Sequence, residues 1–319
     1  MKTNRVVKLL LFLVGFSLLI ALIYRVGFPE IIRVISGAKP HLIFLGILVY
    51  LLVILTRSLK WFLLTRIIEN KINYRQFVPF YLVNSLMGNL TPFKSGEAVT
   101  PFLFKKYLKI PVGQGFSIVI LDRFFELMIF IIILVSAIFY ILNSGIQNNL
   151  ILSVFRGVFI ALFLLLAILI ILLISKRITL KMARLFRLKF IEKELDVFYN
   201  TLSLFKNKKA YQFIIPLTIV AWFLEISAHY LVFSSVFSVS FTHVAVAQII
   251  AAAVIFVTFI PGGVGISEVS MVSTLGLLGY PFVSITSGAI LTRLFLTGTV
   301  LVTGLAGSLL IRGRTYFIP

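Results

Sequence analysis

Long, continuous runs of Leu, Ile, Phe and Val recur along this chain, separated by short polar segments. A run of about 20 apolar residues is long enough to cross a bilayer as an α-helix. The strands of a membrane β-barrel would instead alternate polar and apolar residues, and these runs do not. The pattern therefore predicts six full crossings, at residues 6–24, 41–55, 124–142, 151–174, 211–234 and 283–311.

Two further apolar stretches, 77–104 and 244–278, are interrupted near their middles by proline and glycine. Such breaks free backbone polar groups, which are tolerated at membrane depth only where protein surrounds them or water reaches them. We therefore expect two re-entrant broken helical hairpins. If both stretches cross the membrane twice instead, the chain has eight or more spans.

Composition supports the same class of protein. The chain has 60% hydrophobic and 13% charged residues and a mean hydropathy of +1.11, which predicts an all-α polytopic membrane protein. Residues 1–319 form a single integral membrane domain in this interpretation. The absence of cysteine excludes disulfides and thiolate metal sites, and the three histidines lack the spacing of metal ligands. We expect no metal and no cofactor.

The basic residues are distributed unevenly. Lys and Arg concentrate in segments 2–8, 57–75, 105–109 and 176–209, whereas the loops 143–149 and 235–242 contain neither. Because cytoplasmic loops are enriched in Lys and Arg, this distribution predicts a cell-membrane protein with both termini in the cytoplasm. The loop that carries Arg25, Arg33 and Lys39 does not fit this orientation.

The predicted orientation makes the two hairpins enter from opposite sides. Hairpin 77–104 lies in a first half, 1–175, and opens to the cytoplasm, while hairpin 244–278 lies in a second half, 210–319, and opens to the outside. Opposed hairpins are typical of the inverted repeats of transporters, whose substrate site lies near the bilayer midplane.

The connection 176–209 combines basic residues with apolar residues at helical spacing. This pattern predicts an amphipathic helix that lies on the cytoplasmic leaflet and binds anionic lipids. Nucleic-acid binding is not expected, because the positive-inside rule already explains the net charge of +20.

Both hairpins contain proline, then glycine, then glutamate, in NLTPFKSGE (89–97) and FIPGGVGISE (259–268). Arg123 follows Glu97 at nearly the same distance as Arg293 follows Glu268, so we expect two ion pairs. Helix N-termini at the breaks carry partial positive charge and can hold an anionic group. The candidate substrate site comprises Pro92, Lys94, Gly96, Glu97, Arg123, Pro261, Gly262, Gly263, Gly265, Glu268 and Arg293. The alternative is that these ion pairs serve only the fold.

Glu126, Glu225 and His229 are further polar residues within the apolar runs. Arg123 and Glu126 are three residues apart, so they can meet on one helix face. Glu225 and His229 share one face of the 211–234 crossing and form either a proton relay or a hydrogen-bonded structural pair.

Four motifs carry a resemblance to a known family: TPFKSGE (91–97), LDRFFE (121–126), PGGVGISE (261–268) and LTR (291–293). Through them nearly the whole chain resembles the flippase-like transmembrane domain of lysylphosphatidylglycerol synthases and related standalone membrane proteins. Lys94 and Thr100 depart from that family's pattern, in which Arg is common at these positions. The resemblance implies movement of a lipid headgroup between leaflets. No synthase domain is present in this sequence, so lysyl transfer is not expected.

The sequence thus predicts a flippase-like transporter whose partner is a membrane phospholipid or lipid-linked substrate, of anionic, aminoacylated or glycosylated kind. No catalytic motif is recognisable, so an enzyme is not expected. Two alternatives stay open. An intramembrane enzyme acting on lipid-linked substrates would use Glu97 or Asp122 as its acid or base, and a membrane scaffold would transport nothing.

Overall fold

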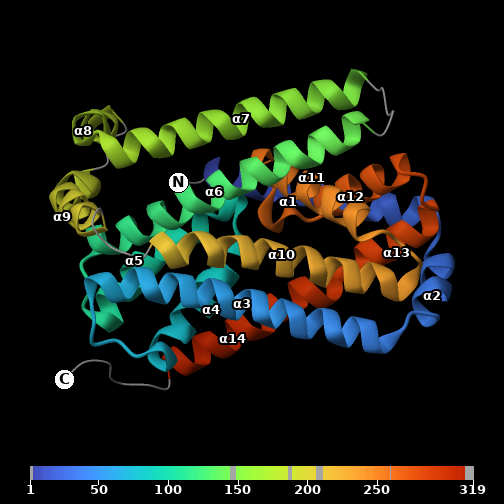
Figure 1. Cartoon of the computed structure of the whole chain (residues 1–319), viewed down its shortest axis with the longest axis horizontal. Helices are drawn as coiled ribbons and strands as arrows, with labels where there is room; N and C mark the ends of the chain where they lie inside the picture. Colours follow the sequence, from blue (N-terminus) through green and yellow to red (C-terminus); the bar gives the residue numbers. More distant parts are fainter. Residues whose placement is uncertain (1–2, 144–148, 186–188, 206–210, 259, 313–319) are drawn as a thin grey trace.

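The computed structural model describes residues 3–143, 149–185, 189–205, 211–258 and 260–312, excluding the side chains of residues 3–12, 92–93, 149–156, 182–183 and 189–193. All regular structure in that part of the chain is helical (Figure 1). The first half contains α1 Thr3–Val26, α2 Phe28–Ser36, α3 Pro40–Ile68, α4 Tyr74–Leu90, the 3-10 helix η1 Pro92–Val99, α5 Thr100–Leu103, the π-helix η2 Phe104–Leu108, α6 Val112–Asn143 and α7 Asn149–Ile174. The rest contains α8 Lys176–Leu185, α9 Lys189–Phe205, α10 Tyr211–Val236, α11 Phe241–Val257, the 3-10 helix η3 Pro261–Gly263, α12 Ile266–Leu277, α13 Phe282–Thr292, the π-helix η4 Arg293–Thr297 and α14 Gly298–Arg312.

Five helical stretches among the described residues are long and apolar enough to cross a membrane: Pro40–Ile68, Val112–Asn143, Gly157–Ile174, Tyr211–Val236 and Phe282–Arg312. They correspond to five of the six predicted crossings. The sixth prediction falls on α1, a 24-residue helix whose described side chains begin at Leu13. These findings confirm an all-α polytopic membrane protein.

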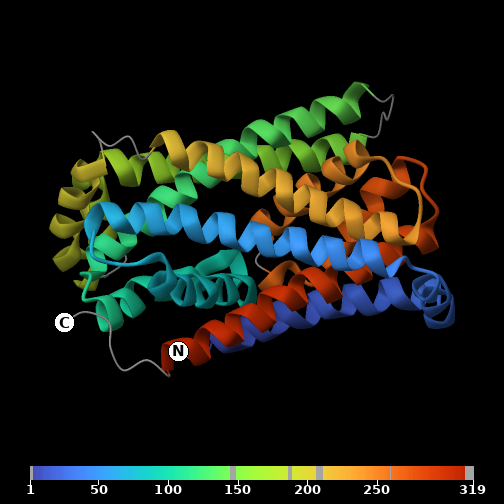
Figure 2. The same ribbon diagram turned by 60° about the horizontal axis from the view of Figure 1, so that its bottom comes forward.

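The two interrupted stretches form helix–break–helix units at opposite ends of the bundle (Figures 1 and 2). In the first unit, α4 leads into η1, and α5 and η2 return toward the end where α8 and α9 lie. In the second unit, α11 and α12 lie toward the opposite end of the bundle, where α2 lies. The predicted proline and glycine breaks are confirmed, and the longest unbroken helix described in either unit has 17 residues.

The two breaks meet inside the bundle. Gly262 has φ +62°, and a β-carbon on it would lie 2.8 Å from the Asn89 carbonyl oxygen at the end of α4. Gly265, with φ +78°, lies against α1, where a β-carbon would come within 1.8 Å of the Gly15 carbonyl oxygen. Only glycine combines these backbone angles with such close approaches.

The long helices pack around the breaks in pairs. α3 lies along α10 and α14 lies along α4. Gly304 and Gly307 of α14 face Leu86 and Leu82 of α4, and a β-carbon on Gly304 would lie 2.4 Å from the Leu86 β-carbon. Small residues at a helix interface allow helices in a membrane to approach closely.

The basic connection differs from the prediction of one helix lying on lipid. It forms two helices, and the apolar face of α9 packs against α6 and the buried core. Leu195, Phe198 and Phe205 are buried there, and the Glu194 carboxylate accepts the Gly113 N–H at 2.9 Å. On α8, by contrast, Ile178 and Leu185 are exposed. The protein core therefore covers the apolar face of α9, whereas these two apolar residues of α8 stay uncovered.

Close packing between α14 and α4 predicts different effects for two glycines. Gly304→Ala places a methyl group against Leu86, and overpacking of this kind costs about 1–3 kcal/mol. Gly298→Ala is the matched control, because no neighbouring atom of the described residues lies within 4 Å of its β-carbon position. Thermal unfolding in detergent should show a lower Tm for Gly304→Ala and an unchanged or higher Tm for Gly298→Ala. Equal Tm values would contradict the described packing.

Candidate functional site in the centre of the bundle

A cavity of about 140 Å³ lies where the two breaks meet α3, α6 and α10. Such a volume is on the order of ten water positions. Its wall combines charged and aromatic residues from both halves of the chain. The residues that line it include Tyr50, Arg57, Lys60, Tyr81, Lys94, Glu97, Asp122, Arg123, Glu126, Trp222, Glu225, Gln248, Phe256 and Gly262.

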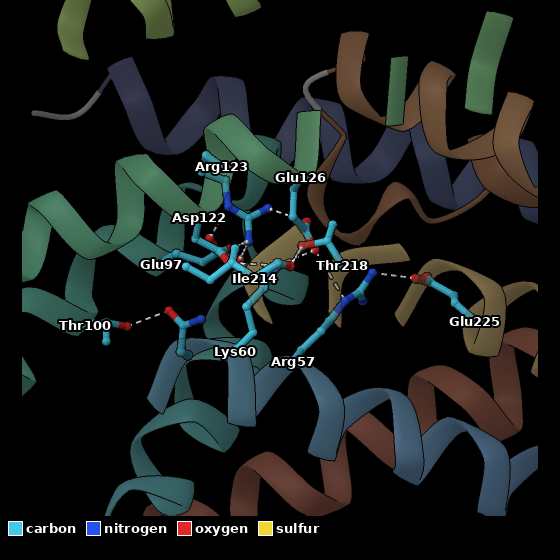
Figure 3. Close-up of polar contacts among 11 residues, drawn as sticks. Arg57, Lys60, Glu97, Thr100, Asp122, Arg123, Glu126, Ile214, Thr218 and Glu225 are labelled. Atoms are coloured by element: carbon cyan, nitrogen blue, oxygen red, sulfur yellow. Dashed lines mark hydrogen bonds and ion pairs between the residues drawn. The ribbon is translucent and has the colours of Figure 1, made fainter. Parts of the chain in front are cut away.

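Arg123 on α6 connects three carboxylates (Figure 3). Its guanidinium pairs with Glu97 of η1: Nη2 donates to Oε1 at 3.1 Å, and Nε lies 2.9 Å from Oε2. Nη2 also donates to Asp122 at 3.1 Å, and Nη1 donates to Glu126 at 3.2 Å. The predicted pairs of Arg123 with Glu97 and with Glu126 are thus both present.

Two cations of α3 complete the network from the other side (Figure 3). Lys60 Nζ lies 2.8 Å from Asp122 Oδ1 and 3.4 Å from Glu126 Oε1. Arg57 Nε lies 3.4 Å from Glu126, while its Nη2 donates to Glu225 of α10 at 2.6 Å. Three helices and η1 are therefore joined by one continuous set of ion pairs.

The positions of Arg57 and Lys60 correct the sequence interpretation, which counted both among the basic residues flanking a crossing. Lys60 is 1% exposed, and α3 continues past both residues to Ile68. Trp61, the residue after Lys60, is also 1% exposed. The physical reason is that Asp122, Glu126 and Glu225 supply partners inside the bundle, where an unpaired charge would cost at least about 3 kcal/mol.

Lys94 differs from the other cations of the cavity. It adopts φ +51°, a left-handed backbone conformation that is uncommon for residues other than glycine. Among the described residues, its ammonium group contacts no carboxylate, and it lies 6.0 Å from the centre of the Phe256 ring. Lys94 therefore presents a charge to the cavity that is not used in a close ion pair.

The second predicted ion pair serves the second break. Arg293 binds Glu268, and its Nη1 and Nη2 donate to the carbonyl oxygens of Gly262 at 2.8 Å and Gly263 at 3.0 Å. The other oxygen of Glu268 accepts the Gly265 N–H at 2.7 Å, which caps α12. Because Glu268 accepts the Gly265 N–H, that N–H is not available to an external anion.

The structure divides the predicted site residues into two groups. Lys94, Glu97, Arg123 and Gly262 line the central cavity, as does Glu225. In the described part of the chain, the residues away from its wall are Gly96, Pro261, Gly263, Gly265, Glu268 and Arg293. The side chain of Pro92 and all of Phe259 lie outside the described residues.

The contact between Glu225 and His229 also differs from the predicted pairing of their side chains. His229 Nδ1 lies 2.8 Å from the backbone carbonyl oxygen of Glu225, whereas the Glu225 carboxylate binds Arg57. The two side chains are therefore engaged with different partners, and the described contacts do not connect them as a relay.

Sequence reasoning missed several residues of the cavity wall. Gln248 of α11 and Trp222 of α10 are 7% and 4% exposed, and Trp222 Nε1 has no hydrogen-bond partner in the described part of the chain. Trp222 also stacks on Arg57, with 5.6 Å from the guanidinium carbon to the ring centre. One signal was present in the sequence, because Gln248 is a lone amide in an apolar helix.

Comparison with known proteins agrees with the motifs. A family model described as the lysylphosphatidylglycerol synthase TM region matches residues 5–317. The chain belongs to this family. A UPF0104 membrane protein of Methanocaldococcus jannaschii is 25% identical, with 88% of each chain covered. Another of Methanothermobacter thermautotrophicus is 26% identical over 80% of this chain and 81% of its own length. A third, of Pyrococcus horikoshii, is 24% identical over 82% and 84%.

Membership of the lysylphosphatidylglycerol synthase TM region family and the apolar helices together identify a multi-pass integral membrane protein. The resemblance stated from the sequence motifs is confirmed. The motif residues Glu97, Asp122, Arg123 and Glu126 form one cluster around the cavity, while Glu268 and Arg293 organise the second break.

The ion-pair network predicts strong coupling between Glu97 and Arg123. Arg123→Gln leaves buried carboxylates without a partner, and breaking a buried pair in this way costs about 3–5 kcal/mol. Adding Glu97→Gln to Arg123→Gln should cost much less than Glu97→Gln alone, giving a coupling energy above about 1 kcal/mol in a double-mutant cycle. Unfolding in detergent measures each variant.

The control cycle uses Glu30 and Arg33 of α2, whose side chains are 55% and 83% exposed and lie 3.9 Å apart. An exposed pair of this kind contributes about 0–1 kcal/mol. A coupling for Glu97 and Arg123 as small as that of the control pair would show that the central network is not a buried unit.

Proposed function

We propose that this protein is a flippase-like lipid transporter that moves a lipid headgroup between leaflets through the central cavity. One observation carries the proposal: a polar, charged cavity lies within an apolar helix bundle, where two helix breaks meet. Charged groups at membrane depth are rare and mark substrate or ion pathways. Acyl chains would stay in the bilayer while the headgroup passes through the sheltered centre.

Geometry supports an inverted repeat as the basis of this transport. Arg123 follows Glu97 by 26 residues and Arg293 follows Glu268 by 25. The residue two places after each break proline, Lys94 or Gly263, has a left-handed φ of 51° or 61°. In our proposal, the two units are re-entrant hairpins, and rocking of one half against the other exposes the cavity to each leaflet in turn.

An enzyme is the less favoured function. Its two candidate acids or bases, Glu97 and Asp122, are both held in ion pairs, with Arg123 and with Lys60. A general acid or base needs a proton-transfer partner within reach, and these contacts occupy both carboxylates.

Transport is tested by reconstituting the purified protein into vesicles that contain a phospholipid with a fluorescent headgroup. The wild type should move the label to the outer leaflet, where an impermeant reductant quenches it, faster than protein-free vesicles do. Lys94→Gln should slow this movement about tenfold through the loss of one charge-assisted interaction with the headgroup. Lys105→Gln, which removes an exposed charge on η2, should not.

The other functions give distinct results in that assay. Equal rates with and without protein would reject transport and favour a scaffold. Conversion of a lipid-linked substrate by the protein in detergent, where no leaflets exist, would favour an enzyme.

We also propose that the α8–α9 end of the bundle lies in the cytoplasm. Ser203 on α9 and Ser238 between α10 and α11 are exposed at opposite ends, and the chain has no native cysteine. In intact cells an impermeant maleimide should label Ser238→Cys and leave Ser203→Cys unlabelled until the membrane is permeabilised. The reverse pattern would show the opposite orientation.

A further inference from the structure

The central cavity offers a guest mostly hydrogen-bond donors. Within the described part of the chain, the Lys94 ammonium group has no close carboxylate, and Trp222 Nε1 is buried without a hydrogen-bond partner. The Gln248 amide lines the same cavity and makes no hydrogen bond to a described residue. Trp222 and Gln248 are more than nine-tenths buried. Buried polar groups without partners are costly, so these three groups indicate a missing ligand that accepts hydrogen bonds.

The negative charges of the same cavity are all in use. Each carboxylate of the network touches a cation, with closest distances of 2.9 Å for Glu97, 2.8 Å for Asp122, 3.2 Å for Glu126 and 2.6 Å for Glu225. A ligand amine would have to displace one of these cations before it could bind a carboxylate. The hydroxyls of Tyr50 and Tyr81 add groups that can bond phosphate oxygens or ligand hydroxyls.

A second cavity, of about 180 Å³, lies next to the first and shares Lys94, Glu97, Arg123, Glu126 and Phe256 with it. The rest of its wall is almost entirely apolar, with Val119 and Leu127 of α6 and Leu165 and Leu169 of α7. Ser95 and Ala98 of η1 line it and are exposed. This second cavity therefore leads from the charged centre to the surface beside α7, whose outer face carries exposed Ile160, Phe163 and Leu164.

From these two cavities we infer the substrate class: an anionic phospholipid whose phosphodiester headgroup carries hydroxyls and no amine. Lys94, Trp222 and Gln248 bind its phosphate and hydroxyl oxygens in the central cavity, and one acyl chain leaves through the apolar cavity between η1 and α7. The inference rests on the proposed function, because it names the lipid that the transporter carries. It excludes a cationic aminoacylated lipid as the preferred substrate.

The test compares labelled lipids in vesicles of phosphatidylcholine that contain the full-length protein. Phosphatidylglycerol should move about tenfold faster than lysyl-phosphatidylglycerol, which has the same phosphodiester but adds amines. Lys94→Gln should abolish that preference and Lys94→Arg should retain it. Movement of lysyl-phosphatidylglycerol at an equal or higher rate would overturn the inference while leaving transport intact. If no lipid moves faster than in protein-free vesicles, the proposed function itself fails.

The path of the acyl chain is tested by filling the apolar cavity. Leu165→Trp should slow phosphatidylglycerol movement several-fold, because the indole occupies the space given to the acyl chain. Leu164→Trp is the matched control, since Leu164 is the adjacent residue and is 57% exposed. Equal rates for both variants and the wild type would overturn the assigned path.

A water-soluble glycerol phosphate separates the lipid from a free phosphate ester as the ligand. It should compete with phosphatidylglycerol only at concentrations far above that of the lipid, because it lacks the acyl chain. Competition at equal concentration would show that the apolar cavity contributes nothing to binding.

Discussion

Pairing of buried charges is the constraint on which the arrangement of this bundle depends. Removing a charge from water costs several kcal/mol in a protein interior, and only well-placed opposite charges with additional hydrogen bonds offset that cost. Arg123 and Lys60 therefore require Glu97, Asp122 and Glu126 at close range. These contacts fix the position of α3 relative to α6 and hold η1 against α6.

The two halves use the same residue types differently. In the first half, the Glu97–Arg123 pair faces the cavity and joins a larger network. In the second, Glu268 and Arg293 bind the backbone of the break itself. Within this break, Gly262 packs closely against the Asn89 carbonyl oxygen. The first interrupted unit thus supplies Lys94 and Glu97 to a centre whose other charges lie on α3, α6 and α10. The second unit supplies backbone at Gly262 and the side chains of Gln248 and Phe256 on α11.

Apolar run length and proline–glycine breaks were enough to predict the helices and the two interrupted units. The equal Glu-to-Arg spacing was enough to predict both ion pairs, because a charge within an apolar run needs a partner. The sequence pattern wrongly placed Arg57 and Lys60 in a cytoplasmic segment, because basic residues near the end of an apolar run are typical of such segments. Their burial depends on carboxylates of α6 and α10, which are distant in sequence. Amphipathic periodicity likewise could not show whether lipid or the α6 core covers α9.

A structure of the protein in a bilayer nanodisc prepared with phosphatidylglycerol tests the central claim most directly. Our account predicts headgroup density beside Lys94 and Gln248. It also predicts acyl-chain density that passes between η1 and α7 toward the membrane. A dry, closed centre with lipid bound only to the outer faces of the helices would contradict it.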